Sequence, residues 1–545
     1  MANDKTKKKA ADLSDSIKAG YKAATEEHGK FLASTPCAEL LQFIAERVTA
    51  AEESGQPLNV EVQLNAEGIK HPQKAQRIGK FIELLQDETK DSGHPLAVVN
   101  GRVCYYNGAN WEPLNNLDFG YFLTRAARLL GVDRYNAIYC DFVTNSAKSF
   151  EIACRADIVP RAAANLLNCK NGTVEIHADG TAELRGHSWR DGLLYVLPYD
   201  YDPQATAPKW ERFLNEVLPD DCDRANLQEY CGSLFAPINH EKIAYLYGAT
   251  GRNGKTTTKD IICGVLGKAN VSYESLESLT ESTSSTGNAA RAALEGKLLN
   301  ACGEVNQKIT NSSILKTLAS RERLSVRPPY QAHTRYISDY ARLLFCANDL
   351  PVFTQGAADA EARRFLFIEF AQRIPAAKVN RNLAREIIAE ELPGVLNWMI
   401  EGLKRLVAQG GAFTPNPNAE NITAQFLEGT NSAYAYLRNY GLKPVTRGNK
   451  IKYPQARVVL IENGALYGNK LEFAAPASEG IDSYTQFCRI TGRQPQGRNK
   501  FLQLLQQLRY STKRTERGRY VEFLVLSAEE LEKEREPRNS DLTLW

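Results

Sequence analysis

The sequence lacks any apolar run long enough to cross a membrane. No stretch of its 545 residues approaches the roughly 20 consecutive apolar residues that a membrane helix needs. The N-terminal segment MANDKTKKKAADLSD has a short basic run with no apolar core after it. It therefore has the pattern of a solvated tail and not of a secretory signal. These absences predict a cytoplasmic chain with no membrane partner.

The sequence also lacks paired cysteines. Eleven cysteines are scattered along the chain, and no two of them form a C-x-x-C. This argues against a zinc ribbon and against a disulfide framework, and it favours a reducing compartment. Internal repeats and long low-complexity tracts are absent as well. With 43% hydrophobic and 24% charged residues, the composition is typical of a globular protein and excludes a fibre.

Three apolar segments predict an α/β core with a mainly parallel sheet. Strands are expected at Ile243–Tyr247, Leu298–Cys302 and Leu343–Ala347, with helical patterns between them. Ligands of such sheets gather at the carboxyl ends of the strands. The first expected strand enters a glycine-rich loop, and the other two are followed by Glu304 and Asn348. The sequence therefore predicts one site at this edge of the sheet.

The glycine-rich loop has the residue types of a phosphate-binding loop. Residues 254–256 (GKT) follow Gly248 and Gly251, which let successive backbone N–H groups point at phosphate oxygens. Lys255 is expected to neutralise the phosphates of ATP, and the Thr256 hydroxyl is expected to hold Mg²⁺. The loop is one residue longer than the usual pattern, and a chance GKT in a turn is the alternative. The predicted nucleotide-binding residues are Gly248, Thr250, Gly251, Arg252, Asn253, Gly254, Lys255, Thr256 and Thr257.

Four further residues are candidates for the chemistry of hydrolysis. Glu304 is expected to hold Mg²⁺ or to polarise the attacking water, although an ordinary strand-end glutamate is the alternative. Asn348 could orient that water, or simply form a turn before Asp349. Arg363 or Arg364 could reach the nucleotide of a neighbouring subunit as an arginine finger, and the alternative is a surface ion pair.

Five stretches, in this order, resemble the superfamily 3 helicases of the phage, plasmid and large-DNA-virus primase-helicase type. They are LYGATGRNGKTT, LEGKLLNACGEVN, ILKTLASRERLSVRPPYQ, LLFCANDLP and EARRFLFIEF. The upstream stretch LLYVLPYDYDPQATAPKWERFLNEVLPDD is similar to the segment that precedes the ATPase in this group. The resemblance implies an AAA+-like P-loop NTPase core in a homo-oligomeric ring, expected to be a hexamer. It also implies 3′→5′ movement on single-stranded DNA through the ring pore.

The resemblance also implies roles for single residues. By motif match, the phosphate and metal residues are Lys255 and Thr256, the catalytic acid and second metal ligand is Glu304, the sensor is Asn348, and the finger is Arg363 or Arg364. Lys316 stands where this group usually has a lysine. Residues 1–90 are too short for the primase domain that many relatives have, so primer synthesis by this chain alone is not expected.

The pore hairpin of this group corresponds to Leu324–Ile337, where the sequence departs from the family pattern. Ser320-Arg321-Glu322 replaces a Gly-Gly-Asp, and Gln331 replaces a lysine. The hairpin residues predicted to touch DNA are Arg327, Tyr330, Gln331 and His333. A structural hairpin that touches no DNA is the alternative.

The clearest electrostatic signal for nucleic acid lies near the C-terminus. From Cys488 to Tyr520, nine lysines and arginines against one glutamate give a charge of +8. An amphipathic helix followed by a basic hairpin resembles a winged helix, which would bind duplex DNA. A solvated basic face is the alternative. The predicted contacts are Arg498, Lys500, Lys513, Arg514, Arg517 and Arg519.

These observations predict six regions and one leading function. The regions are 1–92 (helical, of unknown role), 93–205 (small α/β), 206–240 (helical collar or linker), 241–372 (ATPase core), 373–430 (helical lid) and 431–545 (basic, winged-helix-like). The leading hypothesis is an ATP-dependent DNA helicase in the replication of a phage, plasmid or other mobile element, with a bacterial host. An ATP-assembled origin-binding initiator without strong unwinding is the main alternative, and a P-loop kinase is a third.

Overall fold

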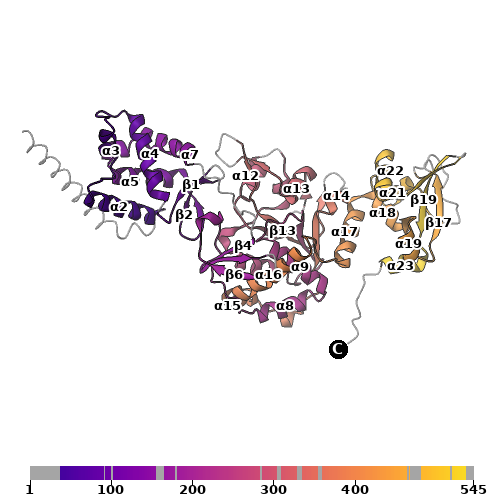
Figure 1. Cartoon of the computed structure of the whole chain (residues 1–545). Helices are drawn as coiled ribbons and strands as arrows, with labels where there is room; N and C mark the ends of the chain where they lie inside the picture. The colour runs from indigo at the N-terminus through magenta and orange to yellow at the C-terminus, as the bar shows by residue number, and fades with distance from the viewer. Residues whose placement is uncertain are drawn as a thin grey trace, which may run out of the picture.

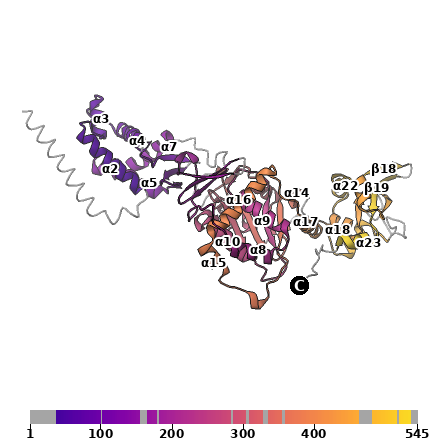
Figure 2. The ribbon, with the colours of Figure 1, turned by 60° about the horizontal axis from the view of Figure 1, so that its bottom comes forward.

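The computed structural model describes residues 37–535, apart from residues 91, 100–101, 155–164, 178–180, 283–284, 304–307, 328–333, 354–358, 463–465, 467–479 and 516–517. The described chain has an N-terminal unit, a central α/β core and a smaller C-terminal unit (Figures 1 and 2). Within the described part, none of the helices has both the length and the apolar character needed to span a bilayer.

The N-terminal unit packs helices against a small antiparallel sheet with strand order β1-β2-β3. Its elements are α2 (Ala38–Glu53), α3 (Val60–Ala66), α4 (Lys74–Lys90), β1 (Leu96–Val99), β2 (Arg102–Tyr106), β3 (Trp111–Pro113), α5 (Asn116–Leu129), α6 (Arg134–Ala137) and α7 (Cys140–Ala153). One cluster of buried side chains runs from Cys37 to Cys154. The helices expected up to residue 92 therefore share a core with the segment that follows them.

A second antiparallel sheet, β4 (Asn165–Cys169), β5 (Gly172–Ile176) and β6 (Ala182–Arg185), joins this unit to the core. The buried Asn168 amide donates to the carbonyl oxygens of Ala109, at 2.7 Å, and Tyr195, at 2.9 Å. The Trp111 indole nitrogen donates to the Trp189 carbonyl at 2.8 Å. Hydrogen bonds therefore connect the N-terminal unit, through Ala109 and Trp111, to the second sheet and the segment that follows it.

The core is a five-stranded, all-parallel sheet with strand order β15-β7-β13-β9-β8. The strands are β7 (Ile243–Tyr247), β8 (Val271–Ser272), β9 (Leu299–Gly303), β13 (Arg342–Ala347) and β15 (Phe365–Glu369). Nearly every residue in β7, β9, β13 and β15 is buried, as expected for a sheet covered on both faces. The prediction of a mixed α/β fold with a parallel sheet is thereby confirmed.

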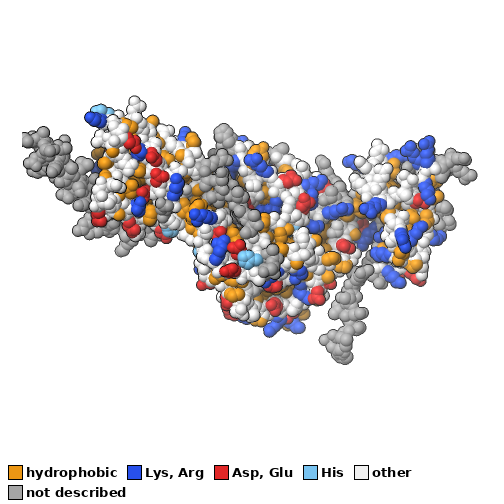
Figure 3. Space-filling model, in the orientation of Figure 1, with side chains coloured by type: hydrophobic (Ala, Val, Ile, Leu, Met, Phe, Trp, Pro, Cys, Tyr) orange, Lys and Arg blue, Asp and Glu red, His pale blue; other side chains and the backbone are white. Residues whose placement is uncertain are grey.

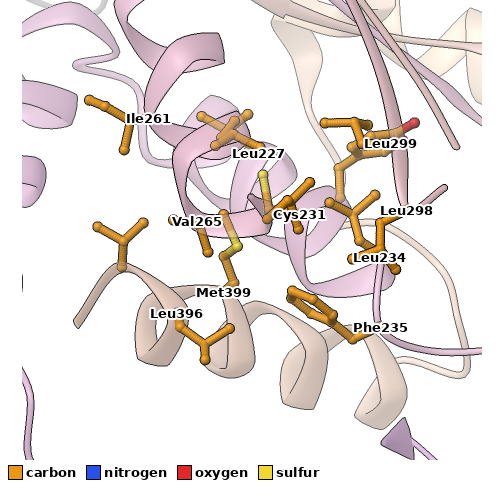
Figure 4. Close-up of a cluster of buried hydrophobic side chains, with 14 of the residues drawn as sticks. Leu227, Cys231, Leu234, Phe235, Ile261, Val265, Leu298, Leu299, Leu396 and Met399 are labelled. Carbon is orange, nitrogen blue, oxygen red and sulfur yellow. The ribbon is translucent and has the colours of Figure 1, made fainter. Parts of the chain in front are cut away.

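One face of the sheet is covered by α8 (Pro208–Val217), α9 (Asp221–Ser233), α10 (Lys255–Leu266), α15 (Leu383–Glu390) and α16 (Leu392–Ala408). Leu227 and Cys231 of α9, Ile261 and Val265 of α10, and Met399 of α16 meet in a single cluster (Figure 4). A Cβ atom at Gly402 would collide with the Gln228 backbone, so α9 and α16 cross at close range. The expected collar helices thus pack on the sheet itself.

The opposite face is covered by α11 (Leu276–Thr280), α12 (Ser285–Ala292), α13 (Ser312–Ala319), the hairpin β11 (Leu324–Val326) and β12 (Arg335–Ile337), and α17 (Pro417–Thr430). The short strand β10 (Lys308–Ile309), just before α13, pairs in parallel with β14 (Val352–Phe353), and the helix α14 (Asp359–Ala362) connects β14 to β15. The Phe426 ring of α17 packs against Phe365 and Phe367 of β15, with ring centroids 5.8 and 5.6 Å away. Helix α17 then leads directly into the C-terminal unit, as Figure 1 shows.

The C-terminal unit is a small α/β fold around the long strand β19. Its elements are α18 (Ser432–Asn439), β16 (Leu442–Pro444), α19 (Arg447–Lys452), β17 (Arg457–Glu462), α21 (Tyr484–Ile490), α22 (Arg498–Gln507), β18 (Thr512–Thr515), β19 (Gly518–Val525) and α23 (Ala528–Arg535). Strands β16, β17 and β18 each pair antiparallel with β19. The expected order of a helix followed by a hairpin is therefore present as α22, β18 and β19.

Candidate functional site

The loop between β7 and α10 has a shape that requires glycine at two positions. Gly254 has φ +90°, and a Cβ atom there would lie 2.8 Å from Val217 of α8. A Cβ atom at Gly248 would collide with the Asn253 amide and the Phe370 carbonyl. Around Gly251, in contrast, a Cβ atom would meet nothing within 4 Å. Two of the three loop glycines are thus needed for steric reasons in this conformation.

Lys255 opens α10, and its side chain turns back over the loop. The residue is only 4% exposed. Its Nζ donates to the Gly248 carbonyl at 2.8 Å, to Asn348 Oδ1 at 2.9 Å and to Asn253 Oδ1 at 3.2 Å. All three acceptors are neutral oxygens. The structure therefore brings together Lys255 and Asn348, two of the residues predicted to form the site.

Asn253 holds the loop in place, a role that the sequence did not reveal. Its buried amide Nδ2 donates to the Thr250 carbonyl at 2.6 Å and to the Phe370 carbonyl at 3.2 Å, just past β15. Its Oδ1 accepts from Lys255. One amide thus ties the loop to a neighbouring strand end and to the lysine. The neighbouring Arg252 has φ 62°, a conformation that costs free energy for a residue with a Cβ atom.

The predicted acid, Glu304, lies outside the described residues. Strand β9 ends one residue earlier, at Gly303, which pairs with Cys346 of β13. A Cβ atom at Gly303 would lie 4.0 Å from the Nζ atom of Lys259. Lys259 is one helical turn beyond Lys255 on α10, so a second cation lies beside the end of β9. Sequence reasoning missed this lysine, although its spacing from Lys255 was a usable signal.

The protonated form of Lys259 is stabilised by the carboxylate of Asp260, its neighbour on α10. Its ammonium lies 3.0 Å from the Asp260 carboxylate. Burial is the largest single effect and lowers the pKa of Lys259, but the hydrogen bond to Asp260 and the attraction to nearby acidic groups together outweigh it, so the pKa is raised above its ordinary value. Lys259 therefore stays protonated at neutral pH.

The predicted metal ligand Thr256 lies at the exposed first turn of α10, and Thr257 beside it is half-buried. The hydroxyl oxygen of a threonine is a ligand that Mg²⁺ accepts together with phosphate oxygens. A glycine-rich loop, a helix N-terminus, a buried lysine and an exposed threonine hydroxyl fit a magnesium-bound triphosphate. Thr250, Gly251 and Arg252 form the exposed outer side of the same loop.

Arg363 and Arg364 lie at the amino ends of the parallel strands, opposite the carboxyl ends where Lys255 and Asn348 meet. They precede β15, whose first residue, Phe365, pairs in parallel register with Ile243, the first residue of β7. A five-residue strand spans about 16 Å, so neither arginine is near Lys255 of its own chain. The Arg364 guanidinium bonds the Glu241 carboxylate, and the Arg363 carbonyl accepts from the Lys242 ammonium at 2.6 Å.

The expected hairpin is present as β11 and β12, with Leu324 opposite Ile337. Arg327 is exposed at the end of β11, whereas Tyr330, Gln331 and His333 lie outside the described residues. At the base of the hairpin, Tyr336 is 59% exposed and the Arg323 guanidinium lies 4.7 Å from its ring centroid. This pair joins a π face to a cation on a solvent-facing surface.

Ion pairs fix the elements around the hairpin. The Glu295 carboxylate bonds Arg335 of β12 and Arg102 of the N-terminal sheet, the latter at 2.6 Å. Lys316 of α13 lies 2.7 Å from the Glu361 carboxylate on α14. The lysine that the resemblance singled out thus connects α13 to the helix that precedes the two arginines.

The basic residues of the C-terminal unit differ in whether they are exposed to solvent or paired with an acidic residue of the same unit. Figure 3 shows lysine and arginine side chains gathered on the visible face of this unit. Arg498 and Lys500 are exposed on α22, and Arg517 lies outside the described residues. On the hairpin, exposed Arg514 stands directly opposite exposed Arg519.

Lys513 on the same hairpin is engaged within the chain. Its ammonium lies 2.5 Å from the Glu522 carboxylate, which also accepts from the Ser511 hydroxyl at 2.6 Å. Hydrogen bonds from Lys513 and Ser511 lower the pKa of Glu522. Lys513 is thus partly neutralised, unlike the cross-strand pair of arginines beside it.

Comparison with known proteins adds two partial family matches. Residues 246–364 match a family described as "Family of unknown function (DUF5906)", and residues 153–219 match one described as "D5 N terminal like". No curated protein matches the chain. The D5 match covers most of the stretch that resembled the segment before the ATPase, and it supports a relationship to the phage-type primase-helicases.

Several solved structures are similar at low identity. "The A form apo structure of NrS-1 C terminal region-CTR(305-718)" is 11% identical, with a TM-score of 0.31 over 62% of this chain and 77% of that chain. "The A form apo structure of NrS-1 C terminal region-CTR" is 11% identical, with a TM-score of 0.32 over 60% of this chain and 80% of that chain.

Proposed function

We propose that this chain is an ATP-driven DNA helicase that moves 3′→5′ on single-stranded DNA in the replication of a phage or other mobile element. The observation that supports it best is the contact between the Lys255 ammonium and Asn348 over a glycine-requiring loop. This contact joins the ends of two parallel strands at the edge where nucleotides bind in α/β sheets. The D5 N-terminal-like match directly upstream favours the same family.

In this proposal the loop holds the triphosphate of ATP with Mg²⁺. Backbone N–H groups of the loop and the first turn of α10 bind phosphate oxygens, and Lys255 neutralises their charge. Thr256 and Glu304 hold the metal, and Asn348 orients the attacking water. Lys255 must exchange at least part of its present hydrogen bonds for phosphate oxygens when ATP binds.

The position of the two arginines supports a ring. Because Arg363 and Arg364 lie at the amino edge of the sheet, they cannot serve the nucleotide held at the carboxyl edge of their own chain. An arginine finger at either position would act on a neighbouring subunit. We therefore propose homo-oligomeric sites between protomers, in a ring that we expect to be a hexamer.

DNA would contact two surfaces. Arg327 and the rest of the β11–β12 hairpin would grip single-stranded DNA in the pore. The C-terminal unit would bind duplex DNA as a winged helix, with α22 and the β18–β19 hairpin as its two contact elements. Two exposed arginines opposite each other on a hairpin repel, which is tolerated where a polyanion binds between them.

The test is hydrolysis and strand displacement by the full chain. We expect Mg²⁺-dependent ATP hydrolysis stimulated by single-stranded DNA, and displacement from a 3′-tailed but not a 5′-tailed partial duplex. Lys255→Ala should abolish both, whereas Lys268→Ala, an exposed lysine just past the other end of α10, should retain them. A wild-type chain that hydrolyses no ATP under these conditions contradicts the proposal.

The alternative is an initiator that uses ATP to assemble on duplex DNA without strong unwinding. The glutamine at position 331, where the family pattern has a lysine, favours it. ATP-dependent assembly on duplex DNA without strand displacement from either tail would select this alternative.

A further inference from the structure

We propose that the exposed face of α22 reads adenine bases in the major groove, which makes the C-terminal unit a sequence-specific duplex binder. This rests on the proposed DNA-binding role of that unit and adds what the unit recognises. The inference follows from the side chains that α22 buries, those that it exposes, and their order around the helix.

The buried side of α22 is apolar. Phe501, Leu504 and Leu505 are buried in the core of the C-terminal unit. The Phe501 ring stacks on Tyr484 of α21, with centroids 4.4 Å apart. These residues fix which face of the helix points outward.

The exposed side has an amide face, defined as Asn499, Gln503, Gln506 and Gln507. All four residues are exposed. At about 100° per residue, they lie within an arc of about 100° on the helix surface. The centre of the outward face of α22 is therefore lined with uncharged amides and not with lysines or arginines.

An amide side chain carries a donor and an acceptor side by side. This pattern matches the N6 donor and N7 acceptor of adenine in the major groove, to which asparagine and glutamine bind in bidentate fashion. Phosphate oxygens offer only acceptors, so phosphate binding alone would favour cations on this face. The amide face thus fits base reading better than simple backbone attachment.

The cations flank the amide face. Lys500 lies on one side of it, and Arg498 lies on the other. Arg514 and Arg519 extend the charge onto the adjacent hairpin. Base-reading groups in the middle with cations at both margins match a groove floor bordered by two phosphate backbones.

The helix is also held rigidly, as base reading requires. In the turn before α22, the Gln496 backbone N–H donates to the Tyr484 hydroxyl at 2.7 Å, and its side chain donates to Asn431 at 2.8 Å. Arg493 donates to the Glu428 carbonyl of α17 at 2.7 Å. A recognition element locked by hydrogen bonds can discriminate between bases because its side chains start from defined positions.

The experiment is selection by the full chain from a random duplex pool at physiological salt, followed by affinity measurements on the selected and a scrambled duplex. We expect an enriched site that contains adenines. Gln503→Ala and Gln506→Ala should each weaken binding to the selected site by roughly tenfold or more, with little change for the scrambled duplex. Both positions are exposed, and unchanged thermal unfolding would show that the variants are folded.

The matched control is Arg514→Ala. It should weaken binding to both duplexes by a similar factor and reduce the salt dependence of binding. Duplex binding without an enriched sequence, or an enriched site without adenine, overturns the adenine inference and leaves the proposed DNA-binding role standing. If the wild-type chain binds neither duplex, the DNA-binding role of the C-terminal unit fails, and the inference fails with it.

Discussion

The Lys255 ammonium lies 2.9 Å from the amide oxygen of Asn348, although 93 positions separate the two residues in the sequence. The contact exists because β7 and β13 are neighbours in a parallel sheet and both residues follow the carboxyl ends of their strands. Asn348 is therefore placed where it can respond to whatever Lys255 binds. A phosphate group that takes over this lysine would release the Asn348 amide to a water molecule or to the phosphate itself.

This contact makes Asn348 a test of the chemical step. Asn348→Ala removes the amide but leaves Lys255 its bonds to Gly248 and Asn253. We expect ATP hydrolysis to fall roughly a hundredfold, as it does when one positioned polar group is lost, while ATP affinity changes much less. Steady-state hydrolysis and binding of a fluorescent ATP analogue would measure the two effects. Asn382→Ala, at an exposed asparagine, is the control; wild-type turnover in Asn348→Ala would dismiss the sensor role.

Two loop glycines offer a matched pair of substitutions. Gly254→Ala places a Cβ atom on a residue with φ +90° and 2.8 Å from Val217, so we expect a loss of about 1–3 kcal/mol in unfolding free energy and weak ATP binding. Gly251→Ala meets nothing within 4 Å and should bind ATP almost as the wild type does. Thermal unfolding with and without nucleotide measures both variants. Equal losses in the two variants would mean that the loop adopts another shape when it binds.

Much of this site could be predicted from the sequence, because its placement follows from buried strands. Runs of apolar residues predicted β7, β9 and β13 to within one residue at each end, and parallel strands bring their carboxyl ends to one edge. That logic placed Lys255 beside Asn348 without knowledge of the helices. The roles assigned to these residues stay predictions.

What the sequence could not supply were contacts fixed by tertiary packing. Asn253 reaches the Phe370 carbonyl only because β15 lies next to β7, and no local pattern signals that pairing. The placement of Lys259 beside Gly303 depends on how α10 crosses the sheet. The sequence predicts a boundary at residue 92, whereas one buried core runs from Cys37 to Cys154. Helical periodicity shows which face of a helix is buried but not what that face packs against.

The arginine finger can be tested by mixing two inactive variants. Lys255→Ala removes the phosphate lysine, and Arg364→Ala removes a finger candidate at the opposite sheet edge. If each site combines Lys255 of one subunit with Arg364 of the next, mixed rings contain some intact sites. We therefore expect ATP hydrolysis to recover in part when the two variants are mixed, and the same design applies to Arg363→Ala.

The control for that experiment is the partner of Arg364 within its own chain. Arg364 bonds the Glu241 carboxylate, so a purely structural role would be lost equally in Glu241→Gln. We expect Glu241→Gln to retain most of the hydrolysis. Loss of activity in Glu241→Gln, together with no recovery when Arg364→Ala is mixed with Lys255→Ala, would assign Arg364 to folding and leave Arg363 as the remaining candidate.

Substitution of Arg514 or Arg519 on the β18–β19 hairpin should raise stability and weaken DNA binding. Arg514 and Arg519 stand directly opposite each other, so removing one relieves like-charge repulsion and should raise unfolding free energy by a few tenths of a kcal/mol. The same Arg519→Ala variant should weaken duplex binding and lower the salt slope by about one unit. Lys513→Ala should have a smaller effect on DNA, since Glu522 already neutralises that lysine, and should lower stability. Urea unfolding and salt titrations measure both quantities; if Lys513→Ala weakened DNA binding more than Arg519→Ala, the hairpin would face the DNA with its other side.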